Sequence, residues 1–149
     1  MKVNCRTEYA LKALADLAAL SRRGEAVPLA GIARRRGIPY AFLEQIMLVL
    51  KHAGYVESRR GKGGGFQLAR PPHHITLGEI VRLLGGPIQQ VTCGACGPGC
   101  GDRNACAFRE VWDQVAAAVE TVVDGVTFRD IVERESEMKQ QRGANTYQI

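Results

Sequence analysis

The chain has 149 residues, enough for one domain with an extension but not for two large domains. Charged residues such as Asp16 interrupt its apolar stretches, so no segment reaches membrane-spanning length, and no signal-peptide pattern is present. We therefore expect a cytoplasmic protein without a membrane partner, in which clustered cysteines favour metal or redox chemistry over structural disulfides.

The net charge of +5 is unevenly distributed along the chain. Residues 1–90 contain 14 Lys and Arg against 6 Asp and Glu, whereas residues 91–149 contain 6 against 9. An anionic partner is therefore expected to bind the N-terminal part, although a merely solvated basic face would give the same count.

The N-terminal part predicts three helices, over residues 6–20, 28–36 and 39–53. Gly37 supplies the turn between the second helix and the third. The buried stripe of the third helix is predicted to be Leu43, Ile46, Met47 and Leu50. A short helix, a glycine turn and a longer helix match a helix-turn-helix, although an ordinary three-helix packing fits the same pattern.

A basic β-hairpin is predicted next, with strands over 55–58 and 66–69 and a glycine-rich tip over 59–65. A phosphate-binding loop or a dinucleotide-binding fingerprint would require a helix after the glycines, but a strand follows them. Placed after a helix-turn-helix, such a hairpin is typical of a wing. Its glycines let the backbone approach a phosphate, and its arginines suit a narrow minor groove.

Four of the five cysteines lie within fourteen residues, in a segment that is too rich in glycine for a regular helix or strand. They are Cys93, Cys96, Cys100 and Cys106. Such a loop can direct several thiolates at one point, as a metal or iron–sulfur centre requires. A four-thiolate zinc site remains an alternative, although the segment has only one Cys-x-x-Cys pair, and a metal-free thiol switch is another.

The C-terminal part predicts further helices. A capping box at Thr76–Glu79 starts a fourth helix that ends near Gly85, and a last short helix is expected from Thr127 to about Glu137. Between them, one long helix carries apolar residues at three- and four-residue steps: Phe108, Val111, Trp112, Val115, Val119, Val122 and Val126. Little domain is left to cover this stripe, which favours a homodimer interface over core packing.

Several segments together resemble the BadM/IscR/NsrR type (Rrf-type) of winged-helix regulators, over roughly residues 1–135. They are Arg6-Thr-Glu-Tyr-Ala-Leu-Lys12, Gly37-Ile-Pro39, Leu43-Glu-Gln-Ile46, Ser58-Arg-Arg-Gly-Lys-Gly-Gly-Gly-Phe66 and the cysteine segment. The resemblance implies a homodimeric transcription factor with a long crossing helix. Many members carry an iron–sulfur cluster and respond to iron status, oxidants or nitric oxide, whereas others, similar to CymR, bind no cluster.

The resemblance also implies ligands for a cluster. The family's three cluster cysteines map to Cys93, Cys100 and Cys106. Some members add a histidine three residues beyond the last cysteine, where this chain has Arg109. Others add a carboxylate from the first helix of the partner subunit, and Glu8 occupies the matching place. Cys96 and Cys5 are the other candidates for the fourth ligand, and the cluster type, 2Fe-2S or 4Fe-4S, stays open.

The predicted fold class is therefore mostly α with a small β-hairpin wing. We expect a winged helix-turn-helix domain (1–86), a cluster-binding loop (87–107), a dimerisation helix with a short C-terminal helix (108–138) and a flexible tail (139–149). The predicted dimer contacts are Val111, Trp112, Val115, Val119 and Val122.

The predicted partner is a double-stranded DNA operator. The residues expected to face base edges are Tyr40, Ala41, Glu44 and Gln45. The carboxylate of Glu44 could accept from a cytosine amine, and the amide of Gln45 could pair with adenine. Phosphates and the minor groove are expected to meet Arg34, Arg35, Lys51, Arg59, Arg60, Lys62, Gly63 and Gly64. A redox or electron-transfer protein using the same cysteines is the alternative, but it needs no basic wing. No serine or histidine is arranged for nucleophilic catalysis, so we expect no enzyme.

Overall fold

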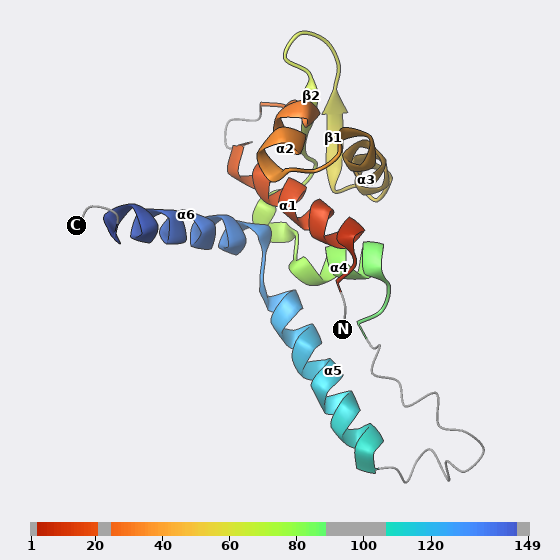
Figure 1. Cartoon of the computed structure of the whole chain (residues 1–149). Coiled ribbons are helices and arrows are strands. Elements are labelled where there is room, and N and C mark those ends of the chain that lie inside the picture. The colour runs from red at the N-terminus through yellow and green to blue at the C-terminus, as the bar shows by residue number, and fades with distance from the viewer. Residues whose placement is uncertain (1–2, 21–24, 89–106, 146–149) are drawn as a thin grey trace.

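The computed structural model describes residues 3–20, 25–88 and 107–145 (Figure 1). Its helices and strands are α1 (Cys5–Leu20), α2 (Leu29–Arg36), α3 (Tyr40–His52), β1 (Val56–Arg59), β2 (Gly65–Leu68), the 3-10 helix η2 (Pro72–His74), α4 (Leu77–Gly85), α5 (Ala107–Gly125) and α6 (Phe128–Asn145). This order confirms the predicted mostly α fold with a two-stranded wing. The predictions made for Cys93, Cys96, Cys100 and Cys106 fall outside the described residues.

The ends of the first three helices follow from local chemistry. The side chain of Asn4 caps α1, because its Oδ1 accepts the amide N–H of Thr7 at 2.7 Å. Pro28 and Pro39 precede α2 and α3 in extended conformations. Gly37 takes a left-handed φ of 64° between these two helices, and its amide donates to the carbonyl of Ala33. The glycine therefore makes the helix-turn-helix turn, as predicted.

The core of the winged domain lies between α1 and α3. The predicted stripe of α3 is buried throughout, at Leu43, Ile46, Met47 and Leu50. On the facing side, Ala10, Leu14 and Leu17 of α1 are fully buried, and the two sets belong to one apolar cluster. Burying such a side chain stabilises the fold by about 1.5–3 kcal/mol. This packing determines which face of α3 points away from the domain.

The wing is anchored to the start of α2. Val27 exchanges two backbone hydrogen bonds with Phe66, of 2.7 and 2.9 Å, in an isolated antiparallel bridge. A Cβ on Gly65 would overlap the carbonyl of Val27, so only glycine fits beside this bridge. Each strand is shifted by one residue from its prediction, with Arg59 opposite Gly65, and the tip is therefore shorter than expected.

Two capping boxes meet where α4 and α6 begin. The hydroxyl of Thr76 accepts from the amide of Glu79, whose carboxylate accepts in return, as predicted. Thr127 and Asp130 make the same arrangement at α6, and the side-chain and backbone hydrogen bonds from Thr127 lower the pKa of Asp130. An isolated bridge pairs Thr76 with Thr127. The corner between α5 and α6 is therefore fastened to the start of α4.

Helix α5 leaves the winged domain, and α6 returns to it before extending away in another direction (Figure 1). The end of α5 is held by a small apolar cluster in which Val123 packs with Val81 and Ile88. Arg82 of α4 also donates two hydrogen bonds to Asp124, of 3.2 and 2.5 Å. The rest of α5 contributes no other buried residue within the described chain.

Helix α6 is longer than the sequence predicts. It ends at Asn145 and not near Glu137, so it includes the first part of the expected flexible tail. Between Phe128 and Gly143 the sequence contains no glycine or proline that would end the helix. Ion pairs one turn apart, Arg129 with Glu133 at 2.8 Å and Arg134 with Glu137 at 2.9 Å, support its exposed turns.

The bridge between Val27 and the wing predicts that Gly65→Ala destabilises the domain by about 1–3 kcal/mol, since the added Cβ overlaps backbone atoms. Gly125→Ala is the matched control, because a Cβ there meets no heavy atom within 4 Å. Its effect should stay within about 0.5 kcal/mol. Urea unfolding followed by circular dichroism measures both. Equal stability of the two variants would show that the bridge does not constrain the wing.

Candidate nucleic-acid interface and cofactor region

Among the residues that the structure describes, no other element covers the face of α3 opposite the core. Because Leu43 and Ile46 point inward, the polar residues between them point outward, and Glu44 and Gln45 are exposed. Tyr40 and Ala41, in the first turn, are exposed as well. The structure thus brings together, on one accessible side, the four residues predicted to face base edges. Carboxylate and amide groups of this kind distinguish base pairs in a major groove.

Sequence reasoning missed Phe42 on the same helix. Its side chain is exposed, and its ring lies edge-to-face on that of Tyr9 from α1, with centroids 5.8 Å apart and planes at 85°. An exposed aromatic ring beside Ala41 adds an apolar surface that can contact a thymine methyl group. The available signal was its position just before the buried stripe, out of phase with Leu43 and Met47.

The tip of the wing presents three cations. Arg59, Arg60 and Lys62 are exposed, and no ion pair is described for any of them. The tip closes tightly, because the amide of Gly64 donates to the carbonyl of Gly61 at 2.9 Å. Gly61 and Gly63 have φ values of 99° and 83°, which other residues rarely adopt. Basic side chains are therefore carried on a compact glycine backbone, as a phosphate or minor-groove contact requires.

Lys51 connects the third helix with the wing. Its Nζ donates to the Oγ of Ser58 at 2.7 Å, so the side chain predicted to contact a phosphate also holds β1 against α3. An ammonium group has three donors, and two of them stay available. The contact keeps the exposed face of α3 and the base of the wing in one relative position.

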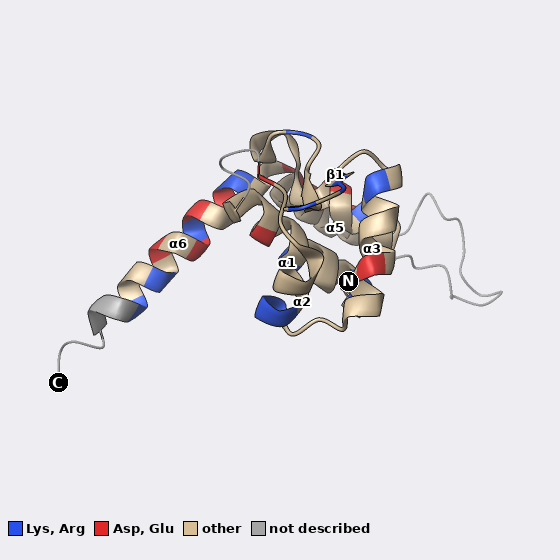
Figure 2. Cartoon of the chain, turned by 90° about the horizontal axis from the view of Figure 1, so that it is seen from above, with Lys and Arg blue, Asp and Glu red and all other residues tan. Residues whose placement is uncertain are grey.

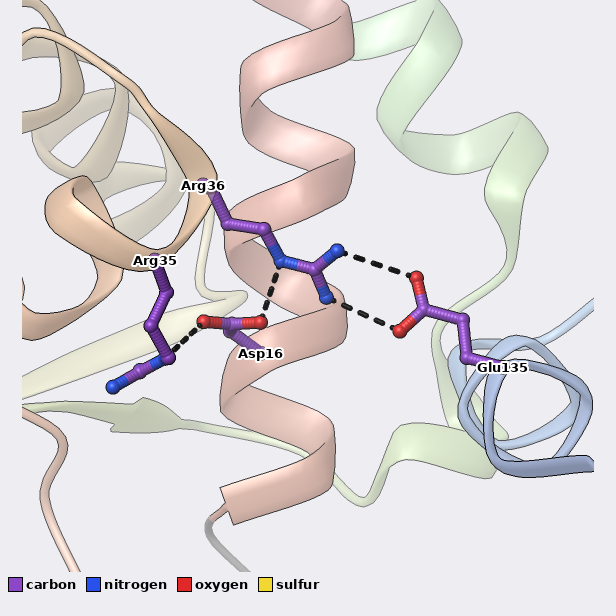
Figure 3. A network of polar contacts seen from close by, with 4 residues as sticks. All are labelled: Asp16, Arg35, Arg36 and Glu135. Atoms are coloured by element: carbon purple, nitrogen blue, oxygen red, sulfur yellow. Dashed lines mark hydrogen bonds and ion pairs between the residues drawn. The ribbon is translucent and has the colours of Figure 1, made fainter. Parts of the chain in front are cut away.

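The arginines at the end of α2 differ in their surroundings (Figure 3). Arg34 is exposed, whereas the Nε of Arg35 donates to Asp16 at 2.9 Å. Arg36 donates to Asp16 at 2.6 Å and, through both terminal nitrogens, to Glu135 of α6. Burial lowers the pKa of Arg36, but the hydrogen bonds and charges of Glu135 and Asp16 outweigh this and raise it. From the sequence alone, Asp16 is only an interruption of an apolar stretch.

The N-terminus of α1 carries the two predicted cluster donors that the structure describes. Glu8 and Cys5 are both exposed, and Glu8 accepts from the Nζ of Lys12 at 2.5 Å. A hydrogen bond with Cys5, followed by smaller contributions from its charge, from burial and from Glu8, raises the pKa of Tyr9. The described residues contain no group of three or more His, Cys, Asp or Glu that could hold a metal ion.

This end of α1 lies against the end of α4. The side chain of Asn4 donates to the carbonyl of Leu84 at 3.3 Å. Residues 86–88 follow α4 and lead to the segment with the four cysteines. A carboxylate and a thiol, both exposed, are ligand types that fit the chemistry of an iron–sulfur centre, although Glu8 is paired with Lys12 here. The described part of the chain therefore places Glu8 and Cys5 at the end of α1 that contacts the end of α4.

Helix α5 exposes most of its predicted stripe. Phe108 has 75% of its surface exposed and Val122 has 65%. Val111, Trp112 and Val115 are exposed as well. Val119 differs, because it packs half-buried against the cluster around Val81 in its own chain. Within the described residues of one chain, a long apolar face of α5 is therefore uncovered, and such faces mark interaction sites.

The family model described as Rrf2, iron-dependent transcriptional regulator, matches residues 3–134. The chain belongs to the Rrf2 family. It is 38% identical over 134 residues to an rrf2-like HTH-type transcriptional regulator of Rhodobacter capsulatus. The alignment covers 85% of this chain and 89% of the relative. The chain is 34% identical over 138 residues to the HTH-type transcriptional regulator IscR of Cereibacter sphaeroides, covering 91% and 89%.

Solved structures of Rrf2 regulators have the same fold. CymR, the global cysteine regulator of B. subtilis, has a TM-score of 0.77 at 32% identity, covering 90% of this chain and 98% of that one. T. potens IscR has a TM-score of 0.74 at 33% identity, covering 93% and 90%. These comparisons confirm the resemblance found from the sequence and identify the chain as a DNA-binding transcriptional regulator. Among the described residues of this Rrf2 protein, no helix is long and apolar enough to cross a membrane.

The uncovered face of α5 predicts that Val115→Asp prevents self-association, because a charge buried in an apolar interface costs several kcal/mol, roughly 3 or more. Ala117→Asp introduces the same charge on an exposed position that α5 turns to another side. Sedimentation velocity should give monomers for the first variant and dimers for the second. A stable dimer of Val115→Asp would show that the interface lies elsewhere.

Proposed function

We propose that this Rrf2 protein is a homodimeric transcriptional regulator that senses iron–sulfur status, redox state or nitric oxide through an iron–sulfur cluster. The observation that carries the DNA-binding part is the combination of a free polar face on α3 with a basic, glycine-built wing beside it. Lys51 and Ser58 hold these two elements together. In the proposed complex, α3 enters a major groove and the wing reaches the adjacent minor groove.

Self-association is supported by the apolar face of α5. An operator with two half-sites requires two recognition helices, and a second copy of this chain would cover the exposed stripe of both subunits. Phe108, Val111, Trp112, Val115 and Val122 are the proposed contacts. Val119 is proposed to contribute indirectly to the interface, because it packs on Val81 within its own subunit and so holds α5 in place.

The cluster ligands proposed are Cys93, Cys100 and Cys106, completed by Glu8 of the opposite subunit or by Cys96. When bound, an iron–sulfur cluster supplies a centre that changes with oxidants, nitric oxide or iron supply. The chain's own contribution is the exposed carboxylate of Glu8, which must leave Lys12 to serve as a ligand. An oxygen donor from another subunit would tie dimer geometry to the state of this site.

A second hypothesis is that the protein is a transcriptional regulator whose cysteines bind zinc instead of an iron–sulfur cluster. Four thiolates within one short segment also suit zinc. CymR of B. subtilis, a global cysteine regulator, has a similar structure. Zinc gives no visible absorbance, whereas an iron–sulfur cluster colours the protein. Anaerobic purification with metal analysis therefore separates the two, and a colourless protein containing zinc would overturn the cluster proposal.

Removal of a wing cation is expected to weaken operator binding. Arg60→Ala should cost about 1.5–3 kcal/mol per subunit if its guanidinium donates to a nucleic-acid acceptor. Arg134→Ala removes the same charge from α6 and serves as the control. Fluorescence anisotropy at several salt concentrations measures the affinity of both variants. For the wild-type dimer, with roughly 6–10 phosphate contacts, the affinity should fall by about 10³–10⁵ between 50 and 200 mM salt. Equal binding of the two variants would remove the wing from the interface.

The fourth ligand can be assigned by reconstituting Glu8→Ala and Cys96→Ala anaerobically. We expect Glu8→Ala to change the visible spectrum and shorten the lifetime of the cluster, because it removes one ligand. Lys12→Ala removes the partner of Glu8 and should leave the spectrum unchanged. Loss of the cluster in Cys96→Ala, with an unchanged cluster in Glu8→Ala, would assign the ligand to Cys96.

A further inference from the structure

The carboxylate of Asp16 joins three helices through two arginines. It is 6% exposed, and its two oxygens accept from different residues: Oδ2 from the Nε of Arg35 and Oδ1 from the Nε of Arg36. The terminal nitrogens of Arg36 then donate to both oxygens of Glu135 at 3.4 and 3.2 Å. Figure 3 shows the resulting chain from Glu135 on α6, through Arg36 and Asp16, to Arg35 on α2.

The two arginines are left in different states by this network. All three nitrogens of Arg36 are used, and 23% of its side chain is exposed. Arg35 uses only its Nε, and 44% of its side chain is exposed. Within the described part of the chain, no hydrogen bond is formed by its terminal nitrogens. Arg35 therefore keeps a free donor pair on a guanidinium whose near end is fixed.

The absence of a side chain at Gly31, one turn earlier in α2, leaves room for this guanidinium. A Cβ on Gly31 would lie 3.2 Å from the Nη1 of Arg35, closer than side chains normally approach. The Arg35 side chain thus lies along α2, held by Asp16 and accommodated by Gly31. A fixed guanidinium loses less conformational freedom on binding a phosphate than a free one, and its paired terminal nitrogens match two phosphate oxygens.

We propose that Asp16 is a positioning residue for DNA binding, which holds Arg35 so that its terminal nitrogens contact a backbone phosphate. Glu135 supports this position through Arg36, which is thereby withdrawn from the DNA. Of the three consecutive arginines, Arg34 and Arg35 then bind phosphate and Arg36 is structural. This inference rests on the proposed operator binding and adds a residue of α1 and a residue of α6 to it.

The test is a double-mutant cycle on the duplex that the wild-type protein selects from a randomised library. Arg35→Ala should reduce the slope of log affinity against log salt by about 1.8, since about 0.9 is lost per phosphate contact in each of two subunits. Asp16→Asn should reduce the slope in the same direction and weaken binding in the wild-type background. In the Arg35→Ala background, Asp16→Asn should change neither quantity.

Two further variants separate positioning from folding. Gly31→Ala favours the helix but requires the Arg35 guanidinium to move by a few tenths of an ångström, so it should weaken binding only when Arg35 is present. Glu135→Gln should bind more weakly than Glu133→Gln, which removes the same charge from an α6 residue paired with Arg129. Urea unfolding at the assay temperature confirms that each variant is folded.

The outcomes distinguish the inference from the proposed function. If Asp16→Asn and Gly31→Ala weaken binding equally with and without Arg35, then both act on the fold alone and the positioning role is wrong. If Glu135→Gln binds like Glu133→Gln, the support from α6 is wrong. If the wild-type protein selects no duplex at all, the proposed operator binding fails and the inference fails with it.

Discussion

The burial of α1 is the constraint on which the other elements depend. Ala10, Ala13, Leu14 and Leu17 are fully buried, and α1 contacts α2, α3, α4 and α6. Alanine lets neighbouring helices approach closely, so the positions of α2 and α3 follow from this surface. Two residues with proposed functional roles lie on this helix: Glu8 is exposed in its first turn, and Asp16 is buried farther along. Packed side chains therefore connect both ends of α1 to the helix-turn-helix.

Helices with a local sequence signature could be predicted from the sequence, whereas contacts between distant segments could not. The stripe of α3 repeats with the period of a helix, and the box at Thr76 has a local signature, so both were found. Arg36 and Glu135 are separated by 99 positions, and no local pattern indicates that they meet. Val119 and Val123 show the same limit, because periodicity marks α5 as apolar without showing which side meets α4.

Charge has two separate uses in this molecule. Figure 2 shows acidic and basic residues interspersed along α6, whereas Lys and Arg occupy the end of α2 and the wing. The ion pairs of α6 lie on exposed turns and contribute little to stability. The pairs around Asp16 are partly buried, so the loss of one partner would leave an uncompensated charge. The predicted preference of an anionic partner for the N-terminal half therefore rests on fewer free cations than the composition suggests.

The fastened corner between α5 and α6 has a mechanical consequence. The bridge of Thr76 with Thr127 and the contact of Arg82 with Asp124 hold this corner, so among the described residues it is the fixed end of α5 and the natural pivot for a tilt of the helix. With 19 residues and a rise of 1.5 Å per residue, α5 is about 28 Å long, so a tilt of about 5° moves its far end by about 2.5 Å. That far end is Ala107, the first described residue after the cysteine segment. A displacement of a few ångströms at Ala107 therefore corresponds to a rotation of only a few degrees at the end of α5 that contacts α4.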